Sequence, residues 1–489
     1  STDRLFLERG FLSGELDQDR VYDRAGCEGR EESGIKQERH GYFVDNSKKR
    51  VINNMGWLLG GKIVNMILSF FVSLATARYL GPDNFGSINY VAAYVSFFSS
   101  ITSLGLSVIV IKEISMGKED DNEVIWTGIL MRFLTAVFST IAVIALVSIT
   151  DKSDPLMVKI AILESIAILA SAFDTFMYWF QGKLLGKYTS IASVVAYIGM
   201  SLYRIYLLAN NADILWFAFA TSVDTLLLSL ILMLCYVREN GFHPKVSVRL
   251  GKSLMKQSYH YMISGLIAIL YSKIDQIMLK QMLDTYSVGL YTAALTIAGL
   301  WGMIPSAFIQ SVSPILYKNA EENRGMFYKR LRQSYAGIWL LNICWSLGVS
   351  IFSYWVIYLL YGKAYLGARG ALVIVVWYTG ITSIGSLTQV YLATENKNKY
   401  VNYFALAGLV TDVVLNALLI PKMGILGAAI ATLVTYTVIH IVMPLAIKDT
   451  RDAGRLIIQG MLFRDVLDDE MKQIIKVSAQ KVLGKLKRK

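Results

Sequence analysis

Long apolar runs separated by short polar corners dominate the pattern along the chain. A bilayer core about 30 Å thick needs roughly 20 apolar residues per helix, and each run is long enough to supply them. The pattern therefore predicts twelve transmembrane helices, approximately over residues 53–78, 86–111, 124–149, 156–180, 188–209, 213–236, 257–280, 286–315, 334–360, 370–393, 400–420 and 424–447. No connector between them exceeds about twenty residues, which leaves no room for a folded catalytic domain outside the membrane.

Two segments lie outside the predicted bundle. Residues 1–50 are polar and contain no apolar h-region, so we expect a disordered extension and not a secretory signal. In residues 450–489, apolar positions recur at helical spacing among many lysines. This pattern indicates a basic amphipathic tail lying on the cytoplasmic membrane surface, and a merely solvated tail is the alternative.

Composition and charge agree with a membrane class. Hydrophobic residues make up 54% of the 489 residues and charged residues 17%, against about 25% charged in a typical soluble domain. The net charge of +12 could suggest a nucleic-acid partner, but its placement argues against one. We count 19 Lys and Arg in residues 48–50, just before the first helix, and in the loops on that side, against 7 in the opposite corners. The positive-inside rule then places both termini of this multi-pass protein in the cytoplasm.

The corner RYLGPDNFGSINY, residues 78–90, carries an internal repeat. It can be laid against QMLDTYSVGLYTA, residues 281–293, with Gly86 over Gly289, an offset of 203. Pro82 fixes φ and the glycines permit a sharp reversal, so this corner predicts a hairpin on the outer face. A second match, at an offset of 212, relates 176–188 to 388–400.

The repeat predicts an all-α polytopic protein of about twelve transmembrane helices in two six-helix lobes. We expect an N-lobe over 51–238, a cytoplasmic linker over 239–256 and a C-lobe over 257–449. The repeats are parallel, because both start on the same side of the membrane. Polar stripes follow both matched corners and predict a cavity between the lobes, although small-residue helix packing also produces such stripes. Three stripe residues are candidate substrate ligands: Asn65, Asn89 and Gln310.

Four bases lie within predicted helices: Lys62, Arg132, Arg204 and Lys273. A base that faces lipid near mid-membrane costs a few kcal/mol, so we expect these residues to face a wet cavity and bind substrate. Arg204 and Lys273 lie in the outer third of the membrane, where snorkelling to the interface is the alternative. Lys62 and Arg132 are therefore the stronger candidates.

Acids also lie deep in the predicted helices: Glu164, Asp174, Asp224, Asp275 and Asp412. Asp275, Asp224 and Glu164 are the candidates for binding a coupling ion, either H⁺ or Na⁺. Structural pairing within one lobe is an equal alternative for Asp224 and Asp412.

The sequence contains no catalytic pattern. The four histidines are scattered, no phosphate-binding glycine loop is present, and the three cysteines show neither paired nor metal-ligand spacing. We therefore expect no enzyme activity, no cofactor and no metal site, and a secondary transporter remains.

Three segments together resemble a known family: YLGPDNFGSINYVAA (79–93), GLSVIVIKEIS (105–115) and KIDQIMLKQMLDTYSVGLYTAA (273–294). They are similar to the polysaccharide-exporter family of oligosaccharide flippases, of Wzx type, within the MATE-like (MOP) superfamily. The resemblance covers about 45–450, and the extension 1–50 departs from it. It implies two lobes that rock around a central cavity, with Asp275 at the position of an acid that the seventh helix often carries in this family.

The resemblance implies a flippase of the cytoplasmic (inner) membrane that moves polyprenyl-diphosphate-linked oligosaccharide units from the cytoplasmic to the outer leaflet for cell-surface polysaccharide biosynthesis. The implied partners are this lipid-linked sugar, membrane lipids and the polysaccharide polymerase machinery. Buried bases suit the two negative charges of a diphosphate, which would be costly to desolvate unpaired. The rivals are a multidrug or cation exporter of MATE type, which calls for an acidic cavity, and a lipid II flippase, which usually has two further helices. A polymerase or ligase would normally present a large outer loop, and a scaffold would not need buried ions.

Overall fold

The computed structural model describes residues 32–464, and this part of the chain contains helices but no strand. Residues up to Met55 form one unit and those from Gly56 another, and the second is described below. The elements are α2 Glu32–Ser103, α3 Leu106–Met116, α4 Asp121–Thr150, α5 Pro155–Ser171, η1 Ala172–Asp174, α6 Thr175–Gly182, α7 Gly186–Ala209, α8 Ile214–Asn240, α9 Val248–Met282, α10 Thr285–Leu300, α11 Met303–Glu322, α12 Arg324–Ile351, α13 Ser353–Leu360, η2 Lys363–Ala368, α14 Arg369–Thr394, α15 Lys399–Met423, α16 Ile425–Thr437, η3 Val438–Val442, α17 Met443–Ala446, η4 Lys448–Thr450 and α18 Arg451–Met461.

The protein is a multi-pass membrane protein. Within residues 32–464, eleven helical segments are long and apolar enough to cross a bilayer. The first, Gly60–Met116, has 57 residues. At about 1.5 Å per residue it is nearly three times as long as a bilayer core of about 30 Å. Gly81 interrupts this segment with φ 72° and ψ 171°, and Pro82 follows it. The segment therefore crosses twice, and the prediction of about twelve transmembrane helices is confirmed.

The bundle has two opposite faces, the Gly81 face and the Gly105 face, each called after a glycine that lies there. The Gly81 face holds Gly81, the α4–α5 corner at Asp151 and η2. The Gly105 face holds the break between α2 and α3, the α8–α9 connection and the α14–α15 corner. The break at Gly105 has a backbone cause, because Leu104 and Gly105 both adopt left-handed φ values, 51° and 63°.

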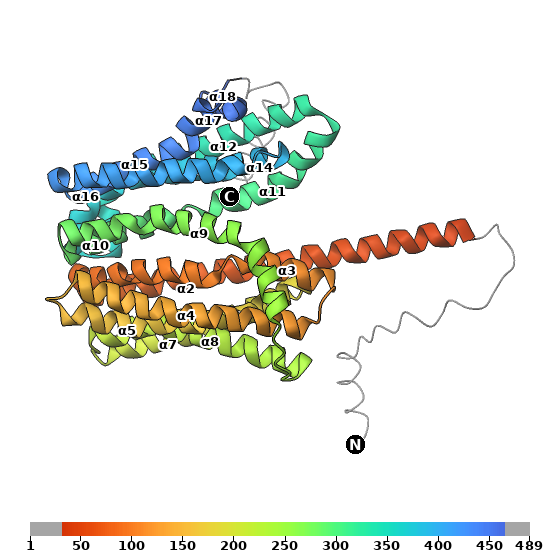
Figure 1. The fold of residues 1–489 in the computed structure, drawn as a ribbon. Helices are drawn as coiled ribbons and strands as arrows, with labels where there is room; N and C mark the ends of the chain where they lie inside the picture. The colour runs from red at the N-terminus through yellow and green to blue at the C-terminus, as the bar shows by residue number, and fades with distance from the viewer. Residues whose placement is uncertain (1–31, 465–489) are drawn as a thin grey trace, which may run out of the picture. The chain divides into compact units, whose positions relative to one another are not determined.

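Helix packing repeats between the two halves of the chain. In the N-lobe α4 packs on α5, α5 on α8 and α7 on α8, and in the C-lobe α12 packs on α14, α14 on α16 and α15 on α16 (Figure 1). The third, fourth, fifth and sixth helices of each lobe thus meet in the same pairs. This agreement supports the internal repeat and confirms the predicted two-lobe fold class.

The hydrophobic core is shared at one face and divided at the other. On the Gly81 side a single cluster joins residues of both lobes, including Tyr90 and Tyr291. On the Gly105 side one cluster belongs to the N-lobe helices and a separate cluster to the C-lobe helices. Leu250 and Leu254, on the first turns of α9, pack into the N-lobe cluster. The lobes are therefore packed together at the Gly81 face, and α9 connects them.

Several predicted helices are interrupted. The predicted 86–111 helix is split at Gly105, the 156–180 helix by η1, and the 286–315 helix between α10 and α11. At the ends, α2 begins at Glu32, inside the segment expected to be disordered, and α18 supplies a helix in the predicted tail. Residues 1–31 and 465–489 lie outside the described residues.

Candidate functional site

The four predicted bases lie in different environments. Lys62 on α2 is exposed and Lys273 on α9 is half-buried, and neither makes an ion pair or hydrogen bond with a residue of the described chain. Arg132 on α4 is 2% exposed. Arg204 on α7 is half-buried. Among the four bases, Arg132 is thus buried, Lys62 is exposed, and Arg204 and Lys273 are half-buried.

Arg132 is held inside the N-lobe. Its guanidinium lies 3.8 Å from the carboxylate of Asp174 and donates to the hydroxyls of Thr175 and Tyr178, each at 3.3 Å. Asp174 ends η1, the 3₁₀ turn that interrupts the predicted fourth helix. Within a membrane, such a break is tolerated where protein covers it. The Arg132–Asp174 pair therefore ties α4 to this break.

Arg204 lies within electrostatic reach of Asp224 and Glu164. None of the three makes an ion pair within 4.0 Å among residues 32–464. Glu164 is 1% exposed, and neither of its carboxyl oxygens has a hydrogen-bond partner. Burying a carboxyl group without partners costs a few kcal/mol, so local pairing does not explain Glu164 at this position.

A second acidic cluster, buried in the C-lobe, contains Asp275 and Asp412. Asp275 Oδ1 accepts a 2.6 Å hydrogen bond from Asn416 Nδ2, and its Oδ2 lies 2.6 Å from the Tyr291 hydroxyl and 2.7 Å from that of Thr432. Asp412 accepts from Thr435 at 2.9 Å. The two carboxyl groups lie close enough to repel one another. These side chains come from α9, α10, α15 and α16, and together they form the acid cluster.

The acid cluster has more acceptors than donors. Two of the cluster's buried side-chain oxygens have no hydrogen-bond partner: Asp412 Oδ2 and Asn416 Oδ1. Within residues 32–464 no base is ion-paired with either acid. Orphaned oxygens around two carboxyl groups are the donor set that a hard cation prefers, and a proton on one acid also relieves the repulsion.

The sequence named Asp275 as a coupling candidate and Asp412 among the buried acids, but it did not place them together and did not single out Asn416, Thr432 or Thr435. Asn416 and Asp412 are four residues apart on α15 and so share one helix face. Thr432 and Thr435 share a face of α16 in the same way. That spacing is visible in the sequence, but the convergence of four helices is not.

The predicted polar stripes are largely satisfied by their own helix. Asn89 donates to the Phe85 carbonyl at 2.7 Å, and Gln310 is exposed on α11. Asn65 is half-buried, and its Oδ1 has no partner. Of these three candidates, Asn65 retains a buried acceptor that is free to bind a ligand.

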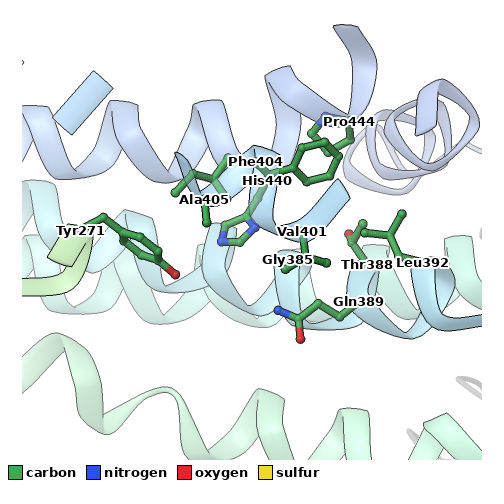
Figure 2. A pocket seen from close by; sticks show the side chains of 11 residues that line it. Tyr271, Gly385, Thr388, Gln389, Leu392, Val401, Phe404, Ala405, His440 and Pro444 are labelled. Carbon is green, nitrogen blue, oxygen red and sulfur yellow. The ribbon is translucent and has the colours of Figure 1, made fainter. Parts of the chain in front are cut away.

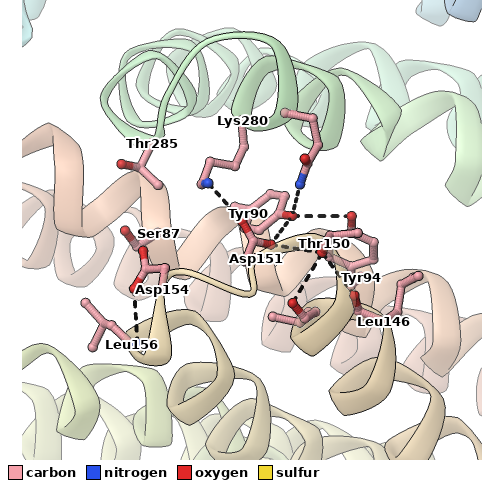
Figure 3. Close-up of polar contacts among 12 residues, drawn as sticks. Ser87, Tyr90, Tyr94, Leu146, Thr150, Asp151, Asp154, Leu156, Lys280 and Thr285 are labelled. Carbon is pink, nitrogen blue, oxygen red and sulfur yellow. Dashed lines mark hydrogen bonds and ion pairs between the residues drawn. The ribbon is translucent and has the colours of Figure 1, made fainter.

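An ion pair joins the two lobes at the Gly81 face. Lys280 Nζ on α9 lies 2.9 Å from Asp151 Oδ1 at the end of α4, and Asp151 also accepts from Tyr90 at 2.7 Å and Thr150 at 2.9 Å (Figure 3). Gln281 donates to the Tyr90 hydroxyl at 2.5 Å. Burial opposes ionisation of Asp151, but the hydrogen bonds from Lys280, Tyr90 and Thr150 lower its pKa below the ordinary value. We call these five residues the interlobe network.

Beside this network the backbones of repeat-related residues touch. A Cβ atom added at Gly86 would lie 1.8 Å from the Thr285 carbonyl oxygen, and one added at Gly289 would lie 1.9 Å from that of Pro82. Gly86 and Gly289 are related by the offset of 203, and so are Pro82 and Thr285. The contact is thus self-complementary, as at a two-fold axis. Glycine is required at both positions for the lobes to close here.

Further bonds cross between the lobes at the same face. Tyr365 donates to the Ala77 carbonyl at 2.8 Å, the Arg78 guanidinium donates to carbonyls at the end of α13, and the Thr285 hydroxyl donates to Asp83. Asp83 lies just after Gly81 and Pro82, and its bond to Thr285 is a structural contact between the lobes. The Gly81 face is therefore closed by packing, hydrogen bonds and an ion pair.

Sequence comparisons identify relatives over most of the chain. A family model described as polysaccharide biosynthesis protein matches residues 51–320. A candidate O-antigen transporter of Escherichia coli (strain K12) is 22% identical over 420 residues, covering 83% of this chain and 99% of the relative. The capsular polysaccharide biosynthesis protein CapF of Staphylococcus aureus is 23% identical over 391 residues, covering 78% of this chain and 95% of the relative.

Solved structures share the fold. The lipid II flippase MurJ in an inward closed conformation matches with a TM-score of 0.64 and 13% identity, covering 86% of this chain and 95% of that one. An inward-facing multidrug resistance MATE family transporter of the MOP superfamily matches with a TM-score of 0.59 and 14% identity, covering 82% and 96%. These likenesses confirm the predicted MATE-like fold. Since the family model covers more than half of the chain, this protein belongs to the polysaccharide biosynthesis protein family.

Proposed function

We propose that this protein is a flippase that moves polyprenyl-diphosphate-linked oligosaccharide across the cytoplasmic membrane by alternating access. The observation that carries the proposal is the hydrophobic core, which is shared by both lobes at the Gly81 face and divided between them at the Gly105 face. Lobes joined at one face and separately packed at the other can rock about the joined face. The names of the sequence relatives, an O-antigen transporter and a capsular polysaccharide biosynthesis protein, support this class of substrate.

Lys62 and Lys273 are proposed to bind the diphosphate. Neither has an ionic partner among residues 32–464. On α9, Lys273 lies seven residues before Lys280, two helical turns away on the same helix face, and Lys280 faces the N-lobe. An anion with two negative charges between the lobes supplies the counter-charge that Lys273 lacks. Asn65 and, more peripherally, Asn89 and Gln310 would then contact sugar hydroxyls. Arg132 and Arg204 remain candidate substrate ligands that lie inside the N-lobe.

The acid cluster is proposed as the site of a coupling cation. Asp275, Asp412 and Asn416 supply carboxylate and amide oxygens, and the orphaned oxygens favour Na⁺ over a proton, because a single proton satisfies only one of them. Glu164 and Asp224 remain coupling candidates in the N-lobe, where the partnerless Glu164 is suited to carry a proton. Equilibrium binding of ²²Na⁺ tests the proposal, since Asp275→Asn should weaken it at least tenfold and Glu164→Gln should not.

The proposed orientation places both termini in the cytoplasm and the Gly81 face outside. The excess of bases in the loops on the Gly105 side supports it. The membrane potential, negative inside, would then favour export of the anionic headgroup by about 2.3 kcal/mol per charge per 100 mV. In this orientation the product emerges where polysaccharide polymerase machinery, a proposed partner, can use it.

Reconstitution tests the function directly. Vesicles holding the full chain should accelerate the movement of a fluorescent polyprenyl-diphosphate oligosaccharide between leaflets, as measured by quenching with an impermeant reagent. Lys273→Ala and Lys62→Ala should each slow this movement at least tenfold, whereas Lys152→Ala, at an exposed corner lysine, should not. Transport of lipid II or of a cationic dye in place of this substrate would favour the two rival functions. Absence of any acceleration contradicts the proposal.

A further inference from the structure

A cavity of about 50 Å³ lies in the C-lobe, lined by residues of α9, α14, α15, η3 and α17 (Figure 2). Its polar lining includes Tyr271, Gln389 and His440. A water molecule needs only about 10–15 Å³ of such space, so the cavity can hold several waters. Leu392 at the end of α14 and Val401 at the start of α15 also line it, so the cavity lies toward the Gly105 face.

The cavity and the acid cluster occupy the same group of helices. On α9, Tyr271 lies one turn before Asp275, and on α15, Ala405 lies two turns before Asp412. Seven residues at ~1.5 Å each separate Ala405 from Asp412, or about 10 Å along the helix. The cavity therefore lies between the acid cluster and the Gly105 face.

Tyrosine side chains occupy the space between them. The Tyr436 ring stacks on Tyr378, with centroids 4.9 Å apart, and on His440 at 5.9 Å, and it meets Tyr271 edge-on at 5.9 Å. The three tyrosine hydroxyls make no hydrogen bond to any residue in 32–464. All three residues are half-buried, and none of their hydroxyls is among the buried side-chain atoms that lack a partner, so these hydroxyls face accessible space.

The backbone is adapted to hold His440 at this point. The helix widens into a π turn at Val438–Val442, and such turns occur frequently at functional sites. A Cβ atom at Gly385 would lie 2.1 Å from His440 Nδ1, so glycine leaves the room that the imidazole needs. Neither ring nitrogen has a hydrogen-bond partner in the described chain, and the ring lines the cavity.

We propose that this cavity is the vestibule of a hydrated path through which the coupling cation reaches the acid cluster from the Gly105 face, with Tyr436 as its gate. The proposal rests on the cation site proposed above. The chemistry suits a partly hydrated monovalent cation, because the hydroxyl, amide and imidazole groups replace water ligands along the path without trapping the ion by charge. A path changes the rates of entry and exit equally, and so leaves the equilibrium affinity unaltered.

The test separates rate from affinity in the purified full chain. Ala405→Phe fills the cavity and should slow ²²Na⁺ exchange at least tenfold while the equilibrium Kd changes less than twofold. Leu406→Phe places the same aromatic ring at the neighbouring exposed position and should leave both unchanged. Unaltered exchange in Ala405→Phe, or slower exchange accompanied by an equally weakened Kd, overturns the path.

A reversible block avoids any effect on folding. With Cys27, Cys235 and Cys344 replaced by serine, Gln389→Cys can be modified by a bulky methanethiosulfonate after purification. Modification should slow exchange, and reduction should restore it; modification without slowing overturns the path. Failure of the unmodified protein to bind ²²Na⁺ overturns the cation site itself and the path with it, whereas intact binding with unslowed exchange overturns only the path.

Discussion

The ion pair between Lys280 and Asp151 sets a measurable part of the balance between closed and open lobes. Lys280→Met removes the ammonium and keeps the apolar stem, leaving Asp151, whose side chain is 3% exposed, with two hydroxyl donors. Removing one partner of a buried pair costs about 3–5 kcal/mol. We expect about 2 kcal/mol, because Lys280 is 20% exposed and the hydroxyls remain. Separation of the lobes hydrates Asp151, so the cost falls on the closed state alone.

A shift of about 2 kcal/mol changes the ratio of closed to open molecules by roughly thirtyfold. Spin labels at the exposed positions Lys152 and Lys363, one in each lobe and both at the Gly81 face, report this ratio as a distance distribution. The short distance, which represents the closed state, should lose population in Lys280→Met. It should recover in the double variant Asp151→Asn with Lys280→Met, because no charge is left unpaired there. An unchanged distribution in the single variant, or purely additive effects in the double one, refutes the reasoning.

Three further outcomes are expected, from the Gly289–Pro82 contact, the Arg132–Asp174 pair and Asp151. Gly289→Ala places a methyl group 1.9 Å from the Pro82 carbonyl, so the same labels should show loss of the closed population without loss of folding. Arg132→Ala should lower the free energy of unfolding by about 3 kcal/mol, and Arg132→Ala with Asp174→Ala by less, as measured by denaturation in detergent. The closed state lowers the pKa of Asp151 below its ordinary value of about 3.9. The stabilisation of the closed state by this carboxylate is therefore complete above about pH 3.9, and it is lost only as the pH falls through the lower pKa of the closed state. The wild-type distance distribution should therefore not change between pH 5 and 8.

The transmembrane segments were predictable because hydropathy and length are local properties. A crossing needs about 20 apolar residues wherever it lies in the bundle, so the runs and the Gly81 corner could be located one at a time. The repeat was predictable for a different reason, since the match of Gly86 with Gly289 is one of sequence order. The structure adds that these two residues touch, which an alignment cannot state.

The grouping of side chains was not predictable in the same way. Helices that are apolar on most sides do not reveal which face meets a neighbour and which meets lipid. Arg132 was expected to face the cavity between the lobes, yet its nearest acid is Asp174 within its own lobe. Asp275 and Asp412 are 137 positions apart, and only the lateral order of the helices brings them together. The interruption at η1 was also missed, because an apolar run does not record a 3₁₀ turn.

One helix, α9, contributes a residue to each part of the proposed transport cycle. Along α9, Tyr271 lines the cavity, Lys273 lies toward the N-lobe, Asp275 belongs to the acid cluster and Lys280 binds Asp151. A cation can bias the lobes only by its difference in affinity between their two arrangements. A hundredfold difference corresponds to about 2.7 kcal/mol, which is similar to the ~2 kcal/mol expected from the ion pair at Lys280. With a difference of that size, release of the proposed cation at Asp275 would offset the contact at Lys280, so neither contribution has to dominate for the cycle to reverse.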